Sequence, residues 1–245
     1  MRKEILSMST GFETCIISKG RADRVKTLRL FPDAYITVPR TDVEDYEKAG
    51  HKKLIVHDRL YCAGARNASL DALVDKTDLL VVDDDITEIG LFKNSKEKIV
   101  YTDSDDVSNL ISKLFDSMHK MGAITFGVAP TDNAYYFSQD KLISKNLFIL
   151  GSFVGYAKGI TLRYDESLIL KEDYDYTVKV WMQTGIALRF NQVYTNAEHY
   201  DNEGGCKEYR TWDLEDEVAA ILMKRYPKYV KPHPRREHEV LLRLK

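Results

Sequence analysis

Short runs of β-branched and aliphatic residues, separated by stretches of helical character, constrain the fold of this chain more than any other feature. The runs are TCIIS (14–18), AYITV (34–38), KLIVH (53–57), LLVVD (79–83) and AITFGV (123–128). Residues 64–76 and 106–122 have the pattern of helices, and in the second the apolar residues recur at the spacing of one buried face. Strands that alternate with helices predict a mostly parallel sheet covered by helices on both sides.

The second half of the chain is patterned differently and opens with an apolar stretch interrupted by glycines, residues 146–159. The elements expected after it are a helix over 172–185, a strand over 187–195, an irregular glycine-rich segment over 198–210, a helix near 212–227 that ends at Pro227, and a basic tail over 230–245 that can end in a short strand. No internal repeat or low-complexity linker separates the two halves, so we expect one domain.

The composition is that of an ordinary soluble globular protein, with 44% hydrophobic and 30% charged residues in 245. A net charge of −2 provides no global basic field, so a nucleic-acid partner would have to meet a local patch. The three cysteines lack CxxC spacing, which argues against a disulfide framework or a cysteine zinc site. With no apolar run suited to a signal peptide or a membrane span, we expect a cytoplasmic protein and no membrane partner.

Three aspartates, Asp83, Asp84 and Asp85, follow the aliphatic run at 79–83. If the strand persists, alternation places Asp83 and Asp85 on one side and Asp84 on the other. Converging carboxylates repel unless a cation lies between them, and Mn²⁺ or Mg²⁺ prefers oxygen ligands and leaves positions open for substrate phosphates. A solvated turn explains the same residues. The aliphatic run favours a ligand site, because ligands of open α/β sheets bind outside the carboxyl ends of strands.

Other polar residues are expected at the same edge of the sheet. Ser18, Lys19 and Arg21 follow the first strand and would hold a nucleobase and a phosphate. Arg66 and Asn67 are expected at the start of a helix, where free amides and a guanidinium favour an anion, although an ordinary helix cap accounts for them as well.

The glycine-rich segment offers a further group of candidates. His199 is a candidate third metal ligand, and a surface histidine is its alternative reading. Gly204 and Gly205 would let backbone approach a phosphate closely, and Lys207 would add a positive contact to the same charge.

Glu172, Asp173 and Asp175 crowd the first turn of an expected helix. The helix dipole alone favours carboxylates there, and a functional reading makes one of them a general base. Their position in the chain does not choose between these two readings.

The ordered set SKGR, VPRTDVEDYEKAG, RN, VVDDDI, GS, EDYD, H, GGC and R, spread over about residues 14–210, resembles one family of glycosyltransferases. These are the GT-A glycosyltransferases associated with TET/JBP-type DNA hydroxylases, which transfer a sugar from a nucleotide donor to 5-hydroxymethylpyrimidine in DNA. The resemblance implies a GT-A-like α/β fold, with a nucleotide-sugar-binding half over 1–130 and an acceptor-binding and catalytic half over 131–245.

The resemblance also implies roles for individual residues. Asp83 and Asp85 would form the metal- and ribose-binding DxD-like element, with Asp84 its less certain member, and His199 would be a metal ligand. Donor contacts would come from Ser18, Arg21, Arg66 and Asn67. The catalytic carboxylate would lie within Glu172–Asp175, with Asp173 as the first choice and Asp175 next.

These roles predict sugar transfer from a UDP-sugar of glucose or arabinose type with inversion at the sugar carbon, in a phage-infected host cytoplasm if the acceptor is phage DNA. The acceptor base, hydroxymethylcytosine or hydroxymethyluracil, would be flipped out and stacked on tyrosines such as Tyr135, Tyr136 or Tyr156. The basic tail, including Arg235 and Arg236, would contact the DNA backbone or simply be solvated. Two alternatives stay open: a GT-A enzyme with a non-DNA acceptor, and a catalytically inactive relative that binds DNA.

Overall fold

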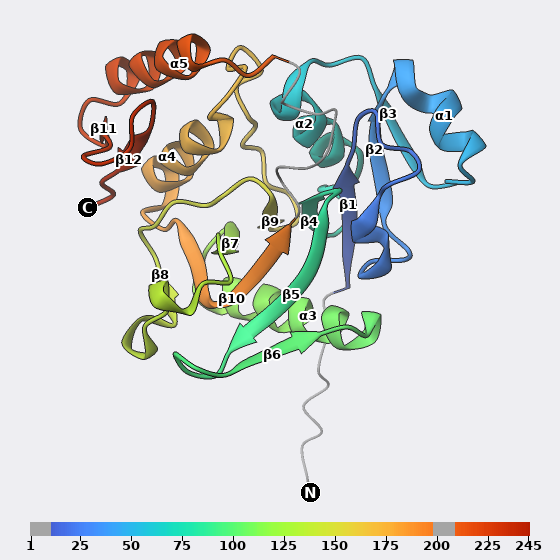
Figure 1. Cartoon of the computed structure of the whole chain (residues 1–245), viewed down its shortest axis with the longest axis horizontal. Helices are drawn as coiled ribbons and strands as arrows, with labels where there is room; N and C mark the ends of the chain where they lie inside the picture. The colour runs from blue at the N-terminus through green and yellow to red at the C-terminus, as the bar shows by residue number, and fades with distance from the viewer. Residues whose placement is uncertain (1–10, 198–208) are drawn as a thin grey trace, which may run out of the picture.

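Ten strands form the main sheet of the computed structural model, which describes residues 11–197 and 209–245 (Figure 1). They are β1 (Phe12–Ile17), β2 (Tyr35–Pro39), β3 (Leu54–His57), β4 (Asp78–Asp83), β5 (Ile86–Phe92), β6 (Lys98–Tyr101), β7 (Thr125–Ala129), β8 (Ile143–Ser144), β9 (Phe153–Tyr156) and β10 (Leu188–Ala197). Their order across the sheet is β3-β2-β1-β4-β9-β7-β10-β5-β6, with β8 beside β10.

The directions of the strands bring the loops after β1 and β4 to the same edge of the sheet. β3, β2, β1 and β4 are mutually parallel, β9 runs against β4 and β7, and β10 is parallel to β7. In the β1–β4 pair, Ile17 lies opposite Asp83, so the loops that follow these two strands start side by side. The side chains that follow β1 and β4 are therefore brought to the same place.

Helices cover both faces of the sheet. They are α1 (Val43–Lys48), α2 (Tyr61–Leu73), α3 (Ser104–Lys120), α4 (Glu172–Thr184) and α5 (Trp212–Arg225), with short 3₁₀ turns η1 (Lys26–Arg29), η2 (Arg40–Asp42), η3 (Ala134–Tyr136) and η4 (Gln139–Lys141). One core contains side chains of α2, α4 and α5, and the other contains those of α1 and α3. A hairpin of β11 (Val230–Pro232) and β12 (Val240–Leu242) closes the chain.

The run of aliphatic residues in β4 has a direct structural reason. Leu79 and Val81 enter the core under α2 and α4, whereas Leu80 and Val82 enter the core over α3, and all four are fully buried. A strand buried on both faces has no polar positions to alternate with apolar ones.

The expected α/β class, with a mostly parallel central sheet flanked by helices in a single domain, is confirmed by this architecture. The strands and helices predicted in both halves are present, with ends shifted by a few residues. The irregular segment expected over 198–210 lies outside the described residues up to 208. β5 and β6 were not anticipated from the sequence, and β9 inserts between β4 and β7 so that both halves share one sheet. Among the described residues, no helix combines the length and the apolar character needed to cross a membrane.

Candidate active site

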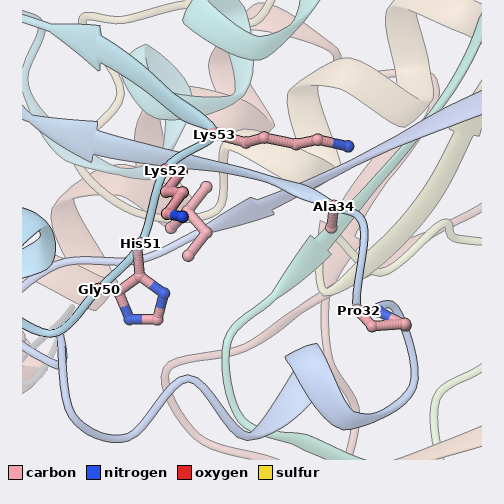
Figure 2. Close-up of a pocket in the computed structure, with 7 residues that line it drawn as sticks. Pro32, Ala34, Gly50, His51, Lys52 and Lys53 are labelled. Carbon is pink, nitrogen blue, oxygen red and sulfur yellow. The ribbon is translucent and has the colours of Figure 1, made fainter.

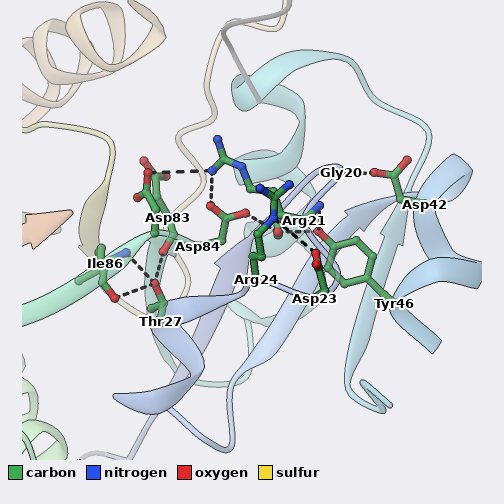
Figure 3. Close-up of polar contacts among 12 residues, drawn as sticks. Gly20, Arg21, Asp23, Arg24, Thr27, Asp42, Tyr46, Asp83, Asp84 and Ile86 are labelled. Atoms are coloured by element: carbon green, nitrogen blue, oxygen red, sulfur yellow. Dashed lines mark hydrogen bonds and ion pairs between the residues drawn. The ribbon is translucent and has the colours of Figure 1, made fainter. Parts of the chain in front are cut away.

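The turn after β4 is the centre of the candidate site (Figure 3). β4 ends at Asp83, a turn forms at Asp84 and Asp85, and β5 begins at Ile86. The alternation of Asp83 and Asp85 with Asp84 was expected only for a strand that persists, and it does not apply because β4 ends at Asp83. Each carboxylate instead has its own surroundings.

Thr27 of η1 holds this turn in place. Its hydroxyl donates to the Asp83 carbonyl oxygen at 2.7 Å and accepts from the Ile86 amide at 2.9 Å. Its own amide donates to the Asp84 carbonyl oxygen at 3.2 Å. The backbone on both sides of the aspartates is thus fixed by one fully buried threonine, which no sequence motif had marked.

The loop after β1 meets the Asp84 carboxylate, as expected for residues leaving the same edge. The Ser18 hydroxyl donates to Asp84, the Arg21 guanidinium donates to it at 2.6 Å, and the Tyr46 hydroxyl donates to Ser18 at 2.6 Å. Burial raises the pKa of Asp84, against the lowering effect of Ser18 and Arg21. The Asp85 carboxylate also lies near this group, 4.0 Å from the Arg21 guanidinium.

Arg66 connects the aspartate turn, which we define as Asp83, Asp84 and Asp85, to α4. It is 3% exposed, and its guanidinium donates to Glu172 at 2.5 Å and to Asp83 at 3.3 Å. α2 begins at Tyr61, so the prediction that Arg66 and its neighbour Asn67 start a helix is wrong; both lie in the helix interior. The guanidinium instead joins two carboxylates that are far apart in the sequence.

Asn67 has its amide committed within the fold. It donates to the Tyr164 carbonyl oxygen at 3.0 Å and to Glu166 at 2.8 Å, and its oxygen accepts from the Tyr164 amide at 2.9 Å. These bonds tie α2 to the loop that precedes α4. The donor contact implied by the resemblance stays a prediction for Asn67.

Asp173 lies beside Glu172 in the first turn of α4, and its carboxyl accepts from the Gly151 amide at 3.1 Å. Burial and the neighbouring Glu172 carboxylate raise the pKa of Asp173 to about 7, although Arg66 and the Gly151 amide oppose this shift. Gly151 cannot carry a side chain here, because a Cβ would lie 2.8 Å from the Arg66 guanidinium. The loop before β9 thereby reaches the same network.

Asp175, the second candidate for the base, has a different environment. It is fully buried, and its carboxylate accepts from Arg225 at 2.8 Å and from the Tyr226 hydroxyl at 2.7 Å. Lys179 is 2.7 Å from its other oxygen. These contacts tie α4 to the end of α5, and they do not include the aspartate turn.

Of the remaining candidate residues, the structure describes only Lys19. Lys19 is exposed at the start of the loop after β1. The other residues, His199, Gly204, Gly205 and Lys207, lie outside the described residues.

The carboxylates at the turn are the candidate ligands of a divalent cation. Within residues 11–197 and 209–245, no group of three histidine, cysteine or carboxylate side chains is arranged to hold a metal. Two carboxylates, Asp83 and Asp85, lie at this turn, and one or two carboxylates together with substrate phosphates are the usual ligands of Mg²⁺. His199 was the expected third ligand.

A separate hollow of about 250 Å³ lies at the opposite end of the strands (Figure 2). Pro32 and Ala34 precede β2 there, and His51 and Lys53 precede β3. His51 contacts the Ala22 carbonyl oxygen at 2.7 Å, and Lys53 is bonded to a backbone oxygen. Its residues do not form a set of convergent catalytic groups, so the aspartate turn remains the candidate site.

The fold and the site together define a mixed α/β protein with a carboxylate-rich candidate site at the carboxyl ends of its parallel strands. No known protein family and no curated protein matches the sequence. Among solved structures, the chain is similar to S. aureus TarS 1–349, with 11% sequence identity and a TM-score of 0.45, over 86% of this chain and 65% of the TarS chain. The chain thus spans less than two thirds of that structure, and a similarity of this degree assigns neither a family nor an activity.

Proposed function

We propose that the protein is a glycosyltransferase that moves a sugar from a nucleotide-sugar donor to a hydroxyl group. The single observation that carries this proposal is the buried Arg66 bridge, which joins Asp83 of the aspartate turn to Glu172 beside Asp173. A donor-binding carboxylate and a candidate general base then belong to one network, as transfer between two substrates requires.

The donor would lie at the carboxyl ends of β1 and β4. Ser18, Arg21 and Asp84 form a hydrogen-bonded group there that suits the ribose and base of a nucleotide such as UDP. Lys19 would approach the phosphates from the same loop. The segment containing Gly204, Gly205 and Lys207 would contribute backbone amides and positive charge to the phosphates.

Mn²⁺ or Mg²⁺ would be held by Asp83, Asp85 and His199. When bound, the cation supplies positive charge that stabilises a departing diphosphate. On their own, the two aspartates place negative charge at the turn, where the Asp85 carboxylate lies 4.0 Å from the Arg21 guanidinium.

Asp173 would act as the general base. With a pKa near 7, a substantial fraction of its carboxyl is ionised at neutral pH, so it can accept the proton of an acceptor hydroxyl as that oxygen attacks the sugar. Attack from the face opposite the leaving group would invert the sugar carbon.

The finer proposal is that the acceptor is the hydroxymethyl group of a modified pyrimidine in DNA, and the sequence resemblance supports it. Tyr135 and Tyr136 are 86% and 68% exposed, which leaves their rings available to stack on a flipped base. Tyr156 does not serve this purpose, because it is fully buried and bonded to Tyr164. Arg235 and Arg236 are exposed on the tail and available to phosphates.

Transfer is tested with a panel of labelled nucleotide sugars, Mn²⁺, and three acceptors: hydroxymethylated DNA, unmodified DNA and free sugars. Mass spectrometry of the digested nucleosides should show one added sugar on hydroxymethylpyrimidine alone, and Asp173→Asn should abolish the signal. Labelling of free sugars alone would remove DNA from the account. Absence of any transfer with every donor would reject the transferase, and DNA binding by such an inactive protein would point to the non-catalytic alternative.

A further inference from the structure

The first turn of α4 is anchored from outside the site as well as from within it. Lys171 immediately precedes the helix, with φ 55° and ψ 24° in the left-handed region. Its side chain is buried, and its ammonium pairs with Glu215 of α5, which is 2% exposed. A buried charge pair thus lies one residue before Glu172 and two before Asp173.

Both features of Lys171 carry a cost that the surroundings must offset. A left-handed conformation is uncommon for a residue with a side chain and persists only where other contacts impose it. An ammonium that leaves water needs a close partner. The Lys171 side chain makes no capping bond to the helix amides, so helix capping does not explain its conformation.

The Glu215 carboxylate would remain paired if Lys171 were removed. Arg210 donates to its other oxygen at 2.5 Å. Substitution of Lys171 therefore tests the link to α4 without leaving an isolated carboxylate in α5. The partly exposed Glu239 carboxylate lies 3.8 Å from the Lys171 ammonium. It also accepts a hydrogen bond from the Tyr174 hydroxyl.

We propose that the Lys171–Glu215 ion pair is a positioning device, which holds the start of α4 so that the Asp173 carboxyl meets the Gly151 amide. Lys171 fixes the backbone on one side of Glu172, and Arg66 fixes the Glu172 side chain on the other. Lys171 and Glu215 touch no reacting group. The catalytic consequence of this proposal rests on the proposed glycosyltransferase function, whereas the effect on the Asp173–Gly151 contact does not.

The test uses the full-length protein labelled with ¹⁵N-glycine, which gives a simple spectrum because the chain contains only 13 glycines. In Lys171→Met the Gly151 amide resonance should move and its hydrogen exchange should accelerate, while Lys171→Arg should stay close to wild type. Lys179→Met is the matched control, since it breaks an ion pair farther along α4. If Lys171→Met does not fold, Lys171→Gly suits the left-handed backbone and removes the same ion pair.

In a transfer assay, Lys171→Met should lower kcat on the order of 10–100-fold, with the donor KM changed by less than about twofold. An unmoved Gly151 amide in Lys171→Met or Lys171→Gly would overturn the positioning role. If the wild-type protein transfers no sugar, the proposed function fails, and the Gly151 amide still decides the role of the ion pair.

Discussion

The Asp173 carboxyl accepts a hydrogen bond from a backbone amide, but its surroundings disfavour ionisation. The Gly151 amide stabilises the carboxylate, while burial and the Glu172 carboxylate favour the protonated form more strongly. A general base is most effective when its pKa lies close to the working pH. The pKa of Asp173, about 7, meets this condition. Asp175 is instead engaged by Arg225 and Tyr226.

This environment predicts how activity depends on pH. Because Asp173 must lose its proton to act as a base, kcat/KM for transfer should rise with pH and level off above about 7. Asp173→Asn should lower kcat by about 10²–10⁴-fold, while Lys179→Met should follow the wild-type profile. A rate that is flat between pH 5.5 and 8.5, or an Asp173→Asn variant that keeps the wild-type kcat, would assign the base elsewhere.

Arg66 is a second residue whose surroundings allow a prediction. Arg66→Met would leave Asp83 and Glu172 without their shared cation, and breaking a buried pair costs about 3–5 kcal/mol in unfolding free energy. We expect the lower end of that range, because the Asp83 side chain is 29% exposed. Chemical denaturation measures the loss.

The exposed pair of Lys48 and Glu44 on α1 provides the control for Arg66. Lys48→Met should change the unfolding free energy by only about 0.3–0.5 kcal/mol. Equal losses for the two variants would contradict the bridging role of Arg66.

At the scale of elements, η1 acts as a clamp on the turn between β4 and β5. Thr27→Val keeps the shape of the side chain but removes the hydroxyl that bonds Asp83 and Ile86. The loss should be about 1–3 kcal/mol in unfolding free energy, together with weaker binding of UDP, measured by calorimetry. Thr102→Val, at an exposed position, should change neither quantity; unaltered UDP binding in Thr27→Val would show that the turn does not depend on this clamp.

Individual elements show which parts of the fold could be predicted from the sequence and which could not. β4 was predictable because both of its faces are apolar, and α3 because its apolar residues form one stripe. The end of β4 at Asp83 was not, since the turn depends on Thr27, which lies 56 residues earlier in the chain. In β5, a glycine is required at Gly90 because a Cβ there would lie 2.2 Å from the Tyr194 ring. β5 was not predicted, since a glycine within a run of strand-forming residues weakens the sequence signal of a strand.

Over the whole molecule, topology carries residues from distant segments to one edge of the sheet. The sequence predicted that the loops after β1 and β4 would meet, because parallel neighbouring strands end together. It did not predict that Arg66 would bridge Asp83 and Glu172, or that Lys171 would be buried against Glu215. Both contacts depend on how α2, α4 and α5 pack, which no local pattern specifies.

A crystal structure of the protein soaked with Mn²⁺ and a UDP-sugar tests whether the carboxylates after β4 hold a cation that carries the diphosphate of a nucleotide sugar. We expect density for the metal and the diphosphate at Asp83 and Asp85, with the uridine beside Ser18 and Arg21. A nucleotide bound elsewhere, or a strand edge that stays free of metal and nucleotide at saturating concentrations, would contradict this expectation.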